Sequence, residues 1–336
     1  MYVLIVGNRG GTNIGECFEK AATRLGASVG FMESQKAMQA PGWLRHFNWH
    51  FRGHRPTKLR RFNNELVEQC SARKPNILIA TGQAPITRNT LGRLRSMGII
   101  AVNYLTDDPW NRSHRADWFI AALPLYNFVF SPRRSNLADL RACGCRLVSY
   151  LPFAYDPDIH FPEATDSIRK AEMNSADVLF VGGADQDRVP YCHSLAQQGF
   201  SMSLYGSYWD RYEVTCPYWR GYGDPRTIRV STAFAKICLL LVRRANRDGH
   251  TMRSLEAPAI GGCLLVEDTD EHRELFGDDC TVVVYFRSIP ELTERAQWLL
   301  RHPDERRRLA TAAHLLITQG ANTYADRLCT ILEFAT

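Results

Sequence analysis

Short apolar runs alternate with segments of helical periodicity along most of the chain. Residues 2–6 (YVLIV) form the first run, and in residues 16–27 (ECFEKAATRLGA) apolar side chains recur at helical spacing. Buried strands that alternate with helices are typical of a parallel sheet covered by helices on both faces. The pattern therefore predicts an α/β protein.

The same alternation runs through both halves of the sequence. In the first half it predicts strands within 74–82, 98–106 and 146–152, helices at 87–97 and 116–124, and a strand followed by a helix in 127–144. In the second half the expected strands lie within 176–183, 200–206, 237–244, 262–268 and 281–286. The expected helices there are 188–198, 231–237, 252–260, 270–276, 290–301 and 303–318. Each half thus has the alternation of strands and helices that is typical of a doubly wound domain.

A segment rich in Pro and Asp separates the two halves. It covers residues 151–166 (LPFAYDPDIHFPEATD), after which the strand–helix rhythm restarts. The length of 336 residues exceeds the roughly 250–300 residues at which one hydrophobic core stops growing. We therefore expect an N-terminal domain at 1–160, a C-terminal domain at 161–318, and a C-terminal helix at 319–336 that packs back on the N-terminal domain.

Composition narrows the class of protein further. Apolar residues make up 45% of the chain and charged residues 23%, as in ordinary globular proteins. We expect neither a secretory signal nor a membrane span, because no apolar run approaches ~18 residues. The ten cysteines are scattered without paired CxxC units, which favours reduced thiols in a cytosol and argues against a zinc site.

One segment carries most of the uneven charge. Residues 44–61 hold six Arg or Lys and neither Asp nor Glu, while the net charge of the whole chain is +6. Aromatic residues Trp43, Phe47, Trp49 and Phe51 lie among them. Such a segment is either a solvated basic face or an interface with a phosphate-bearing partner or a membrane surface.

A glycine-rich loop, GNRGGTNIG (7–15), joins the first strand to the first helix. Its spacing matches neither the dinucleotide GxGxxG motif nor a P-loop. The loop is either a simple tight turn or a place where an anion or sugar meets amides at a helix N-terminus. In the second interpretation, acceptor-side contacts come from Gly10, Gly11, Thr12 and Asn13.

Two carboxylates, Asp248 and Glu256, flank the start of the helix expected at 252–260. Asp248, His250 and Thr251 lie in the loop that follows the strand within 237–244. A carboxylate at such a place can accept the two hydroxyls of a ribose, and the helix N-terminus can receive phosphate oxygens. The alternative is an ordinary helix start, capped by Thr251 and with Glu256 in its first turn.

The surrounding residues resemble a known family. HTMRSLEAPAIGGCLLVEDTDEHRELF (250–276) is similar to the glycosyltransferase group 1 pattern, with Asp248 in place of the first glutamate of an E-x7-E pair. Together with LFVGGADQDRVPYCHSLAQQGFSMSLYG (179–206), YLTDDPWN (104–111), YLPFAYDP (150–157) and NTYADR (322–327), it most resembles the CgeB-like spore-protein glycosyltransferases. The resemblance covers nearly the whole chain and weakens across 33–70.

This resemblance implies a GT-B fold, in which two doubly wound Rossmann-like domains face a central cleft. The donor, a nucleoside-diphosphate sugar such as a UDP-sugar, would be held by the C-terminal half. Glu256 would bind the ribose, Arg188 would neutralise the diphosphate, and Asp248 would face the donor sugar as a catalytic candidate. The donor-binding residues implied in this way are Gly182, Gly183, Arg188, Tyr205, Gly206, His250, Thr251, Arg253 and Glu256.

A second pair of carboxylates, Asp107 and Asp108, follows the strand within 98–106. Either could be the general base that activates an acceptor hydroxyl, or the Asp-Asp-Pro sequence could simply form a turn. The GT-B resemblance implies that no divalent ion is used, so we expect neither a metal site nor a cofactor besides the sugar nucleotide.

The function predicted is glycosyl transfer to a glycan, protein or lipid-linked acceptor. Two alternatives remain open: an epimerase that acts on the sugar nucleotide itself, and a non-catalytic carbohydrate-binding or coat-assembly protein. The place of action expected is the cytoplasm, with peripheral contact with the inner face of the membrane. Nucleic acid is not an expected partner.

Overall fold

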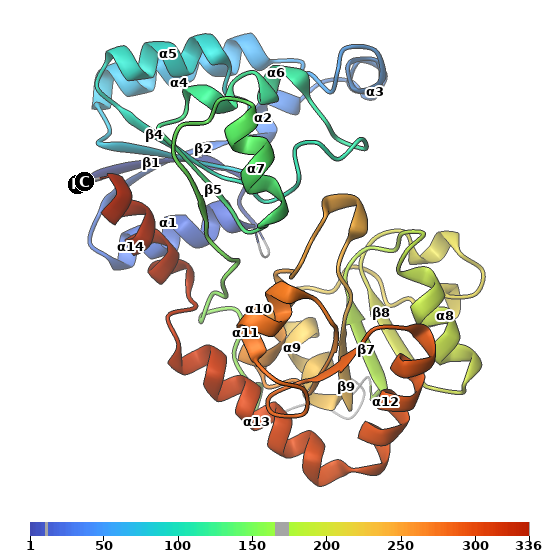
Figure 1. Ribbon diagram of the computed structural model, residues 1–336. Helices are drawn as coiled ribbons and strands as arrows, with labels where there is room; N and C mark the ends of the chain where they lie inside the picture. The colour runs from blue at the N-terminus through green and yellow to red at the C-terminus, as the bar shows by residue number, and fades with distance from the viewer. Residues whose placement is uncertain (11–12, 165–174, 336) are drawn as a thin grey trace. The chain divides into compact units, whose positions relative to one another are not determined.

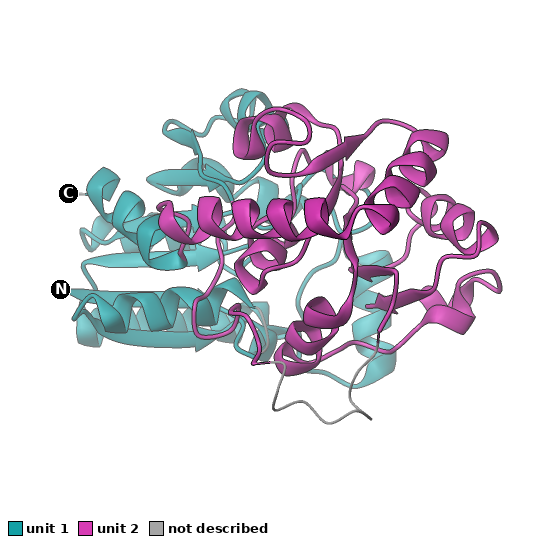
Figure 2. Cartoon of the chain, turned by 90° about the horizontal axis from the view of Figure 1, so that it is seen from below, with its two compact units in different colours: residues 1–152, 324–336 teal, residues 153–323 magenta. Residues whose placement is uncertain are grey.

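The chain folds into two compact units, coloured separately in Figure 2. The computed structural model describes residues 1–10, 13–164 and 175–335. Unit 1 comprises residues 1–152 and 324–336, and unit 2 comprises residues 153–323. The division after 152 precedes the sequence-based boundary at 160, and the return at 324 follows the one at 318.

Unit 1 is built on a six-stranded parallel sheet with the order β2-β1-β3-β4-β5-β6. Its strands are β1 (Tyr2–Gly7), β2 (Ser28–Glu33), β3 (Ile77–Thr81), β4 (Ile100–Tyr104), β5 (Phe128–Ser131) and β6 (Val148–Tyr150). Apolar runs such as VLIV form the central strands because these strands are buried on both faces.

Helices cover both faces of this sheet. They are α1 (Ile14–Arg24), α2 (Gln35–Met38), α3 (Gly42–Phe51), α4 (Leu59–Arg73), α5 (Arg88–Ser96), α6 (Asp117–Ile120), α7 (Ser135–Ala142) and the C-terminal α14 (Tyr324–Ala335). Figure 1 shows α4 and α5 on one face, and α1 and α14 on the other. The Phe18 and Tyr324 rings meet edge to face at 5.6 Å, so the last helix completes the core of unit 1.

Unit 2 contains a five-stranded parallel sheet with the order β11-β10-β9-β7-β8. Its strands are β7 (Val178–Val181), β8 (Met202–Tyr205), β9 (Ile237–Leu240), β10 (Leu264–Glu267) and β11 (Val284–Phe286). Its helices are α8 (Val189–Gln197), α9 (Pro225–Phe234), α10 (Arg253–Ile260), α11 (Asp270–Phe276), α12 (Ile289–Arg301) and α13 (Pro303–Gln319). The prediction of two doubly wound parallel-sheet domains is confirmed.

One predicted helix is wrong. The helix expected at 231–237 is α9, which begins earlier, at Pro225, and ends at Phe234. The Asp224 carboxylate accepts a hydrogen bond of 2.8 Å from the Thr227 amide, and Pro225 occupies the first helical position. This combination of cap and proline starts the helix there, and it leaves Ile237 to begin β9.

The strand orders define one switch point in each unit. In unit 1 the order reverses between β1 and β3, and in unit 2 it reverses between β7 and β9. Loops after neighbouring strands diverge to opposite faces at such a point, and open α/β sheets bind ligands in the crevice this leaves. The glycine-rich loop after β1 and the loops after β7 and β9 are therefore the natural places for a site.

The two ends of unit 2 lie side by side. Tyr155 forms a parallel bridge with Thr323, and the Tyr155 amide donates to the Asn322 carbonyl at 3.0 Å. The chain therefore enters and leaves unit 2 at one place.

Two further observations concern the chain as a whole. In the part of the chain that the structure describes, no helix is long and apolar enough to cross a membrane. All ten cysteines are free thiols, and Cys143 and Cys145 approach to 3.7 Å between their sulfur atoms.

A buried histidine fixes the start of α10 against the end of β10. The ring Nδ1 of His272 lies 2.8 Å from the Glu267 carbonyl oxygen, and its Nε2 lies 2.8 Å from the Ser254 hydroxyl. Because a carbonyl only accepts, Nδ1 carries the proton and Nε2 accepts from Ser254. Ser254 Oγ in turn accepts from the Thr251 amide at 3.1 Å. Burial lowers the pKa of His272 to about 4, so the folded protein holds a neutral ring at neutral pH.

We expect His272 to make unit 2 acid-labile. Its pKa is about 6.5 when unfolded and lower when folded, so the unfolded state binds more protons as the pH falls below about 6.5. The stability that the neutral ring contributes is therefore complete above about pH 6.5, and on the order of 2–3 kcal/mol of it is lost by about pH 4.5. The free energy of unfolding, measured with urea at about pH 6.5 and about pH 4.5, should fall less between the two for His272→Gln than for the wild type. Equal losses would mean that other groups cause the acid sensitivity.

Candidate functional site

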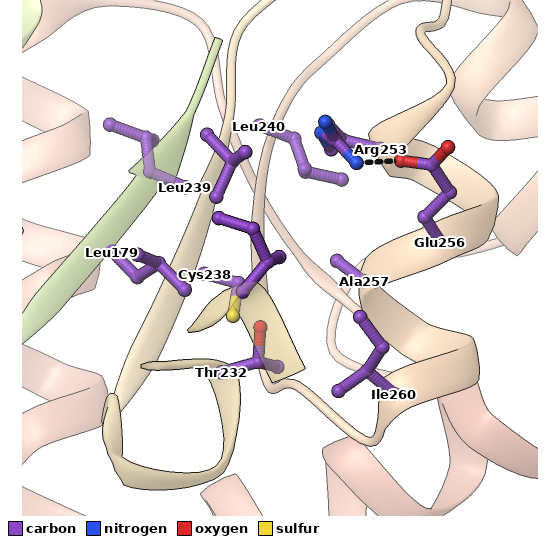
Figure 3. A pocket seen from close by; sticks show the side chains of 11 residues that line it. Leu179, Thr232, Cys238, Leu239, Leu240, Arg253, Glu256, Ala257 and Ile260 are labelled. Atoms are coloured by element: carbon purple, nitrogen blue, oxygen red, sulfur yellow. Dashed lines mark hydrogen bonds and ion pairs between the residues drawn. The ribbon is translucent and has the colours of Figure 1, made fainter. Parts of the chain in front are cut away.

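A small cavity lies at the switch point of unit 2. It is bounded by β7, β9, α9 and α10, and its enclosed space of about 20 Å³ has room for one water molecule. Its lining is mostly apolar, with Arg253 and Glu256 of α10 at one side (Figure 3). The lining residues are Leu179, Val181, Ile228, Thr232, Cys238, Leu239, Leu240, Arg253, Glu256, Ala257 and Ile260.

Glu256 is a buried carboxylate with one oxygen committed and one not. Its side chain is only 1% exposed, and Oε2 forms an ion pair with the Arg253 guanidinium, one helical turn earlier (Figure 3). Oε1 has no hydrogen-bond partner among the described residues and lies 3.5 Å from His160 Nε2. A buried acceptor without a partner costs free energy, so Oε1 is prepared for a donor group that the protein alone does not supply.

His160 is the second half of this arrangement, and no motif in the sequence pointed to it. Its Nδ1 accepts a 3.1 Å hydrogen bond from the Asp156 amide, so the neutral ring carries its proton on Nε2. Burial lowers the pKa of His160, which favours this neutral form. Nε2 also lacks a hydrogen-bond partner within the described ranges. A hydroxyl that accepts from His160 and donates to Glu256 would satisfy both groups.

Arg188 joins the two loops of the switch point. Its guanidinium is 6% exposed and donates to the Gly183 carbonyl at 3.2 Å and to the Leu241 carbonyl at 3.1 Å. These carbonyls belong to the loops after β7 and β9, so Arg188 holds both in place. Burial lowers the pKa of Arg188 from its usual high value, and Asp185 opposes this at 3.7 Å.

Arg243, which the sequence analysis did not single out, is more accessible than Arg188. Its side chain is 38% exposed, and its Nε lies 3.7 Å from the same Asp185 carboxylate oxygen that Arg188 approaches. A Cβ on Gly183 would lie 3.5 Å from the Arg243 Nη2, so the guanidinium lies beside the glycine loop. The sequence signal was present in the pair Arg243-Arg244, which follows the buried strand β9 after two residues, but a pair of arginines alone carries no specific chemistry.

The predicted glycines lie at close backbone contacts. Gly206 has a φ of +133°, and a Cβ there would overlap the backbone of Gly182. The Gly182 amide donates to the Tyr205 carbonyl at 2.8 Å, and its carbonyl accepts from Trp209 Nε1 at 2.8 Å. Tyr205 is buried, and its hydroxyl accepts from Ser231 Oγ at 2.9 Å. Gly182, Gly183, Tyr205 and Gly206 therefore form one tightly packed group at the ends of β7 and β8.

The loop before α10 holds the His250 ring in contacts within unit 2. His250 Nε2 accepts from the Phe153 amide at 3.2 Å, and Nδ1 lies 2.9 Å from Glu271 Oε2, so both ring nitrogens are engaged within unit 2. Thr251 is not the helix cap, because Met252 occupies that position and Thr251 donates its amide to Ser254. Burial lowers the pKa of Arg188, and the charge of the partly exposed Asp248, like that of Asp185, opposes this lowering.

The glycine-rich loop of unit 1 is described only in part, because Gly11 and Thr12 lie outside the described residues. Gly10 has a φ of +92°, in the region that favours glycine. Asn13 precedes the first residue of α1, and its side-chain amide donates to the Gly10 carbonyl at 2.6 Å. This loop follows β1 at the switch point of unit 1.

The two aspartates after β4 differ in environment. Asp108 is 1% exposed, and its carboxylate accepts from the Trp110 amide at 2.9 Å, as in a turn. Asp107 is partly exposed, and its carboxylate accepts from the Thr106 hydroxyl at 3.3 Å. Of the two, Asp107 has the accessible carboxylate. Across the described ranges, no group of three His, Cys, Asp or Glu residues is placed to hold a metal ion.

Comparison with known sequences finds a similarity over the larger part of unit 2 and most of α14. Residues 188–333 match the family model described as glycosyl transferase-like. The matched region contains Arg188, Arg243 and Glu256 but not His160. No curated protein matches the sequence significantly.

Solved structures match over nearly the whole chain. Sucrose-phosphate synthase from Thermosynechococcus elongatus has a TM-score of 0.71 at 13% identity and covers 99% of this chain and 98% of its own. HepE of Anabaena, in complex with UDP-glucose, has a TM-score of 0.63 at 13% identity, with complete coverage of both chains. A putative UDP-N-acetylglucosamine 2-epimerase from Listeria monocytogenes has a TM-score of 0.59 at 12% identity and covers 99% of this chain and 95% of its own.

These likenesses and the two parallel sheets establish the architecture. The chain has the GT-B fold, and residues 188–333 are similar to glycosyl transferases.

Proposed function

We propose that the protein is a glycosyltransferase that uses a nucleoside-diphosphate sugar as donor. The observation that carries this proposal is the buried pair of unpartnered atoms, Glu256 Oε1 and His160 Nε2, at a switch point of a GT-B fold. The glycosyl transferase-like match of residues 188–333 and the UDP-glucose complex of HepE support it.

In this proposal the ribose of the donor satisfies the unpartnered pair. One hydroxyl accepts from His160 Nε2 and donates to Glu256 Oε1, and the Arg253 ion pair holds the carboxylate in place. The packed group around Gly206 would border the base and the ribose.

The diphosphate would lie over the glycine loop after β7. Negative charge grows on the diphosphate as the bond to the sugar lengthens, and donors aimed at that charge lower the barrier. Arg243 contributes a partly exposed guanidinium, and Arg188 contributes buried charge while holding both loops. Asp248 would face the sugar. Positive side chains at this place support a metal-independent reaction without any other cofactor.

The acceptor side is assigned to unit 1. Asp107 is the preferred general base because its carboxylate is accessible, whereas the Asp108 carboxylate is used in a turn. Gly10 and Asn13, at the switch point of unit 1, would contact the acceptor, which is a glycan, a protein or a lipid-linked sugar. Membership of the CgeB-like group and a cytoplasmic place of action belong to the same proposal.

Screening thermal stability against UDP-, GDP-, ADP- and dTDP-sugars tests the proposal directly. A donor that binds only the folded state stabilises it by about 2.7 kcal/mol at 100 times its dissociation constant. Slow hydrolysis of that donor should accompany binding. Stabilisation without hydrolysis or transfer would indicate a non-catalytic carbohydrate-binding protein.

A second candidate, a sugar-nucleotide epimerase, is favoured by one observation. The putative epimerase from Listeria monocytogenes has the same fold over nearly the whole chain. An epimerase converts the sugar nucleotide without an acceptor, so the isomeric sugar nucleotide would form in the purified protein with donor alone.

We predict that Glu256→Gln weakens binding of the nucleotide that the screen identifies by about 10- to 100-fold. A hydrogen bond to a charged group contributes about 1.5–3 kcal/mol, and the amide supplies a weaker acceptor on a similar frame. Calorimetry should show the same loss for the diphosphate and for the nucleoside, because both contain the ribose. Unchanged affinity in a folded variant rules out the ribose assignment.

A separate prediction concerns His160→Phe. The variant should bind the ribonucleotide less tightly, by about 5- to 10-fold, because one neutral hydrogen bond contributes about 1 kcal/mol. The wild-type preference for the ribonucleotide over its dideoxy analogue should shrink in parallel. A full preference in the variant would show that His160 only fills space.

Arg243→Ala should weaken the nucleoside diphosphate by about 10- to 100-fold and leave nucleoside binding unchanged, because the proposed partner is the phosphate charge. The matched control is Arg301→Ala on α12, an exposed arginine whose loss should change neither affinity. Arg188→Ala should reduce thermal stability as well, since it also removes the contacts to Gly183 and Leu241. Equal losses of nucleoside and diphosphate affinity in Arg243→Ala contradict the assignment.

A further inference from the structure

The helix α3 of unit 1 exposes large apolar side chains and buries a polar one. Its apolar side chains face outward: Trp43 is 73% exposed, Phe47 48% and Phe51 74%. The residue that it buries is polar, because Asn48 is 4% exposed and donates to Thr57 Oγ1 at 2.8 Å. A helix of a globular protein ordinarily shows the opposite pattern, so this outward face is made for contact with something else.

The exposed aromatic side chains form a continuous stripe. Trp43, Phe47 and Phe51 are spaced four residues apart, which places them along one side of the helix. The rings of Phe47 and Phe51 stack with their centroids 5.4 Å apart. Figure 1 shows α3 at the edge of unit 1, beyond the end of the sheet.

Exposed basic residues lie on α3 and in the segment that follows it. The exposed residues Arg45, Arg52, Arg55 and Arg60 belong to the segment 44–61, which holds six Arg or Lys and no acidic residue. The surface therefore complements a partner that has an apolar interior and a negatively charged surface.

A basic pocket lies between α2 and α4, the helices that precede and follow α3 in the chain. Its volume is about 160 Å³, and it is lined by Lys36 and Gln39 near α2, and by Lys58, Arg61, Phe62 and Glu65 at α4. Arg61 pairs with Glu65 at 2.7 Å, and Lys58 Nζ lies 3.4 Å from Gln39 Oε1. Three cations against one carboxylate leave the pocket with net positive charge and room for a phosphate group.

We propose that α3 and the pocket of Lys36, Lys58 and Arg61 form a lipid-docking surface for an anionic bilayer. The stripe Trp43–Phe47–Phe51 enters the boundary between headgroups and acyl chains, and the pocket receives a lipid phosphate. Aromatic and basic residues on one short helix suit this interface, where apolar burial and attraction to anionic lipids act together. The proposal concerns unit 1 alone and does not depend on the donor chemistry of unit 2.

The test is sedimentation of the full chain with vesicles of phosphatidylcholine alone, or of equal parts phosphatidylcholine and phosphatidylglycerol. We expect binding to the anionic vesicles only, and weaker binding as salt rises, because the Debye length falls from about 10 Å at 0.1 M to about 3 Å at 1 M. Equal binding to both kinds of vesicle would overturn the role of charge. Absence of binding to either overturns the proposal.

Three pairs of variants separate the parts of the surface. W43S/F47S/F51S should lose binding to anionic vesicles, whereas L147S/L315S/L316S, which changes three other exposed apolar residues, should not. R52E/R55E/R60E should weaken partitioning by about 100-fold, since each basic residue near an anionic surface contributes about fivefold. R88E/R93E/R95E makes the same charge change on α5 and should have a much smaller effect. K36E/K58E tests the pocket and should weaken binding to anionic vesicles more than R93E/R95E, its matched control on α5.

Quenching of tryptophan fluorescence by lipids brominated in the acyl chains gives an independent readout. Quenching in the wild type should disappear in W43F/W49F, which keeps the helix apolar and removes its two indoles. Quenching that persists would place another surface in the membrane. Self-association that depends on Trp43 and Phe51, without vesicle binding, would show that the stripe is covered by a second copy instead.

Discussion

Parallel strand pairing is the constraint on which the rest of this molecule depends. Every strand pair in the described sheets is parallel, so each strand must be followed by a crossover before the next can join the sheet. Within each sheet the carboxyl ends of the strands then lie at one edge, and in unit 2 the loops after β7 and β9 diverge at that edge. Arg188 donates to a carbonyl in each of these loops, so one buried cation stabilises the crevice that the topology opens.

Local pattern predicted the fold well wherever burial on both faces imposed an apolar run. The central strands and most helices followed from this, and α11 and α13 lie within one residue of their expected bounds. The edge strand β2 (SVGFME) escaped prediction because it is only partly buried and its residues are mixed. The helices α2 to α4 were also not placed, and in α3 the outward aromatic stripe reverses the usual amphipathic pattern. In α9, Asp224 and Pro225 overrode the apolar pattern.

The candidate site was accessible to sequence reasoning only where a motif keeps its residues close in sequence. Glu256 and the glycines after β7 belong to such motifs. His160 is remote from Glu256 in sequence, and only the tertiary fold places it 3.5 Å from that carboxylate. For His250, the sequence placed the residue correctly in the loop but could not reveal that Phe153 and Glu271 engage its ring. Partners of buried polar groups are tertiary facts, and short-range spacing does not encode them.

The bridge between Tyr155 and Thr323 has a consequence for biosynthesis. Unit 2 is an insertion of about 170 residues whose ends lie side by side, and α14, which completes unit 1, is synthesised only after all of unit 2. At roughly 5–20 residues per second, synthesis of unit 2 takes roughly 10–30 s, and the sheet of unit 1 lacks its final helix during that time. Unit 1 is thus begun before unit 2 but completed after it. During that interval the face of α1 that carries Phe18 lacks its contact with Tyr324 of α14.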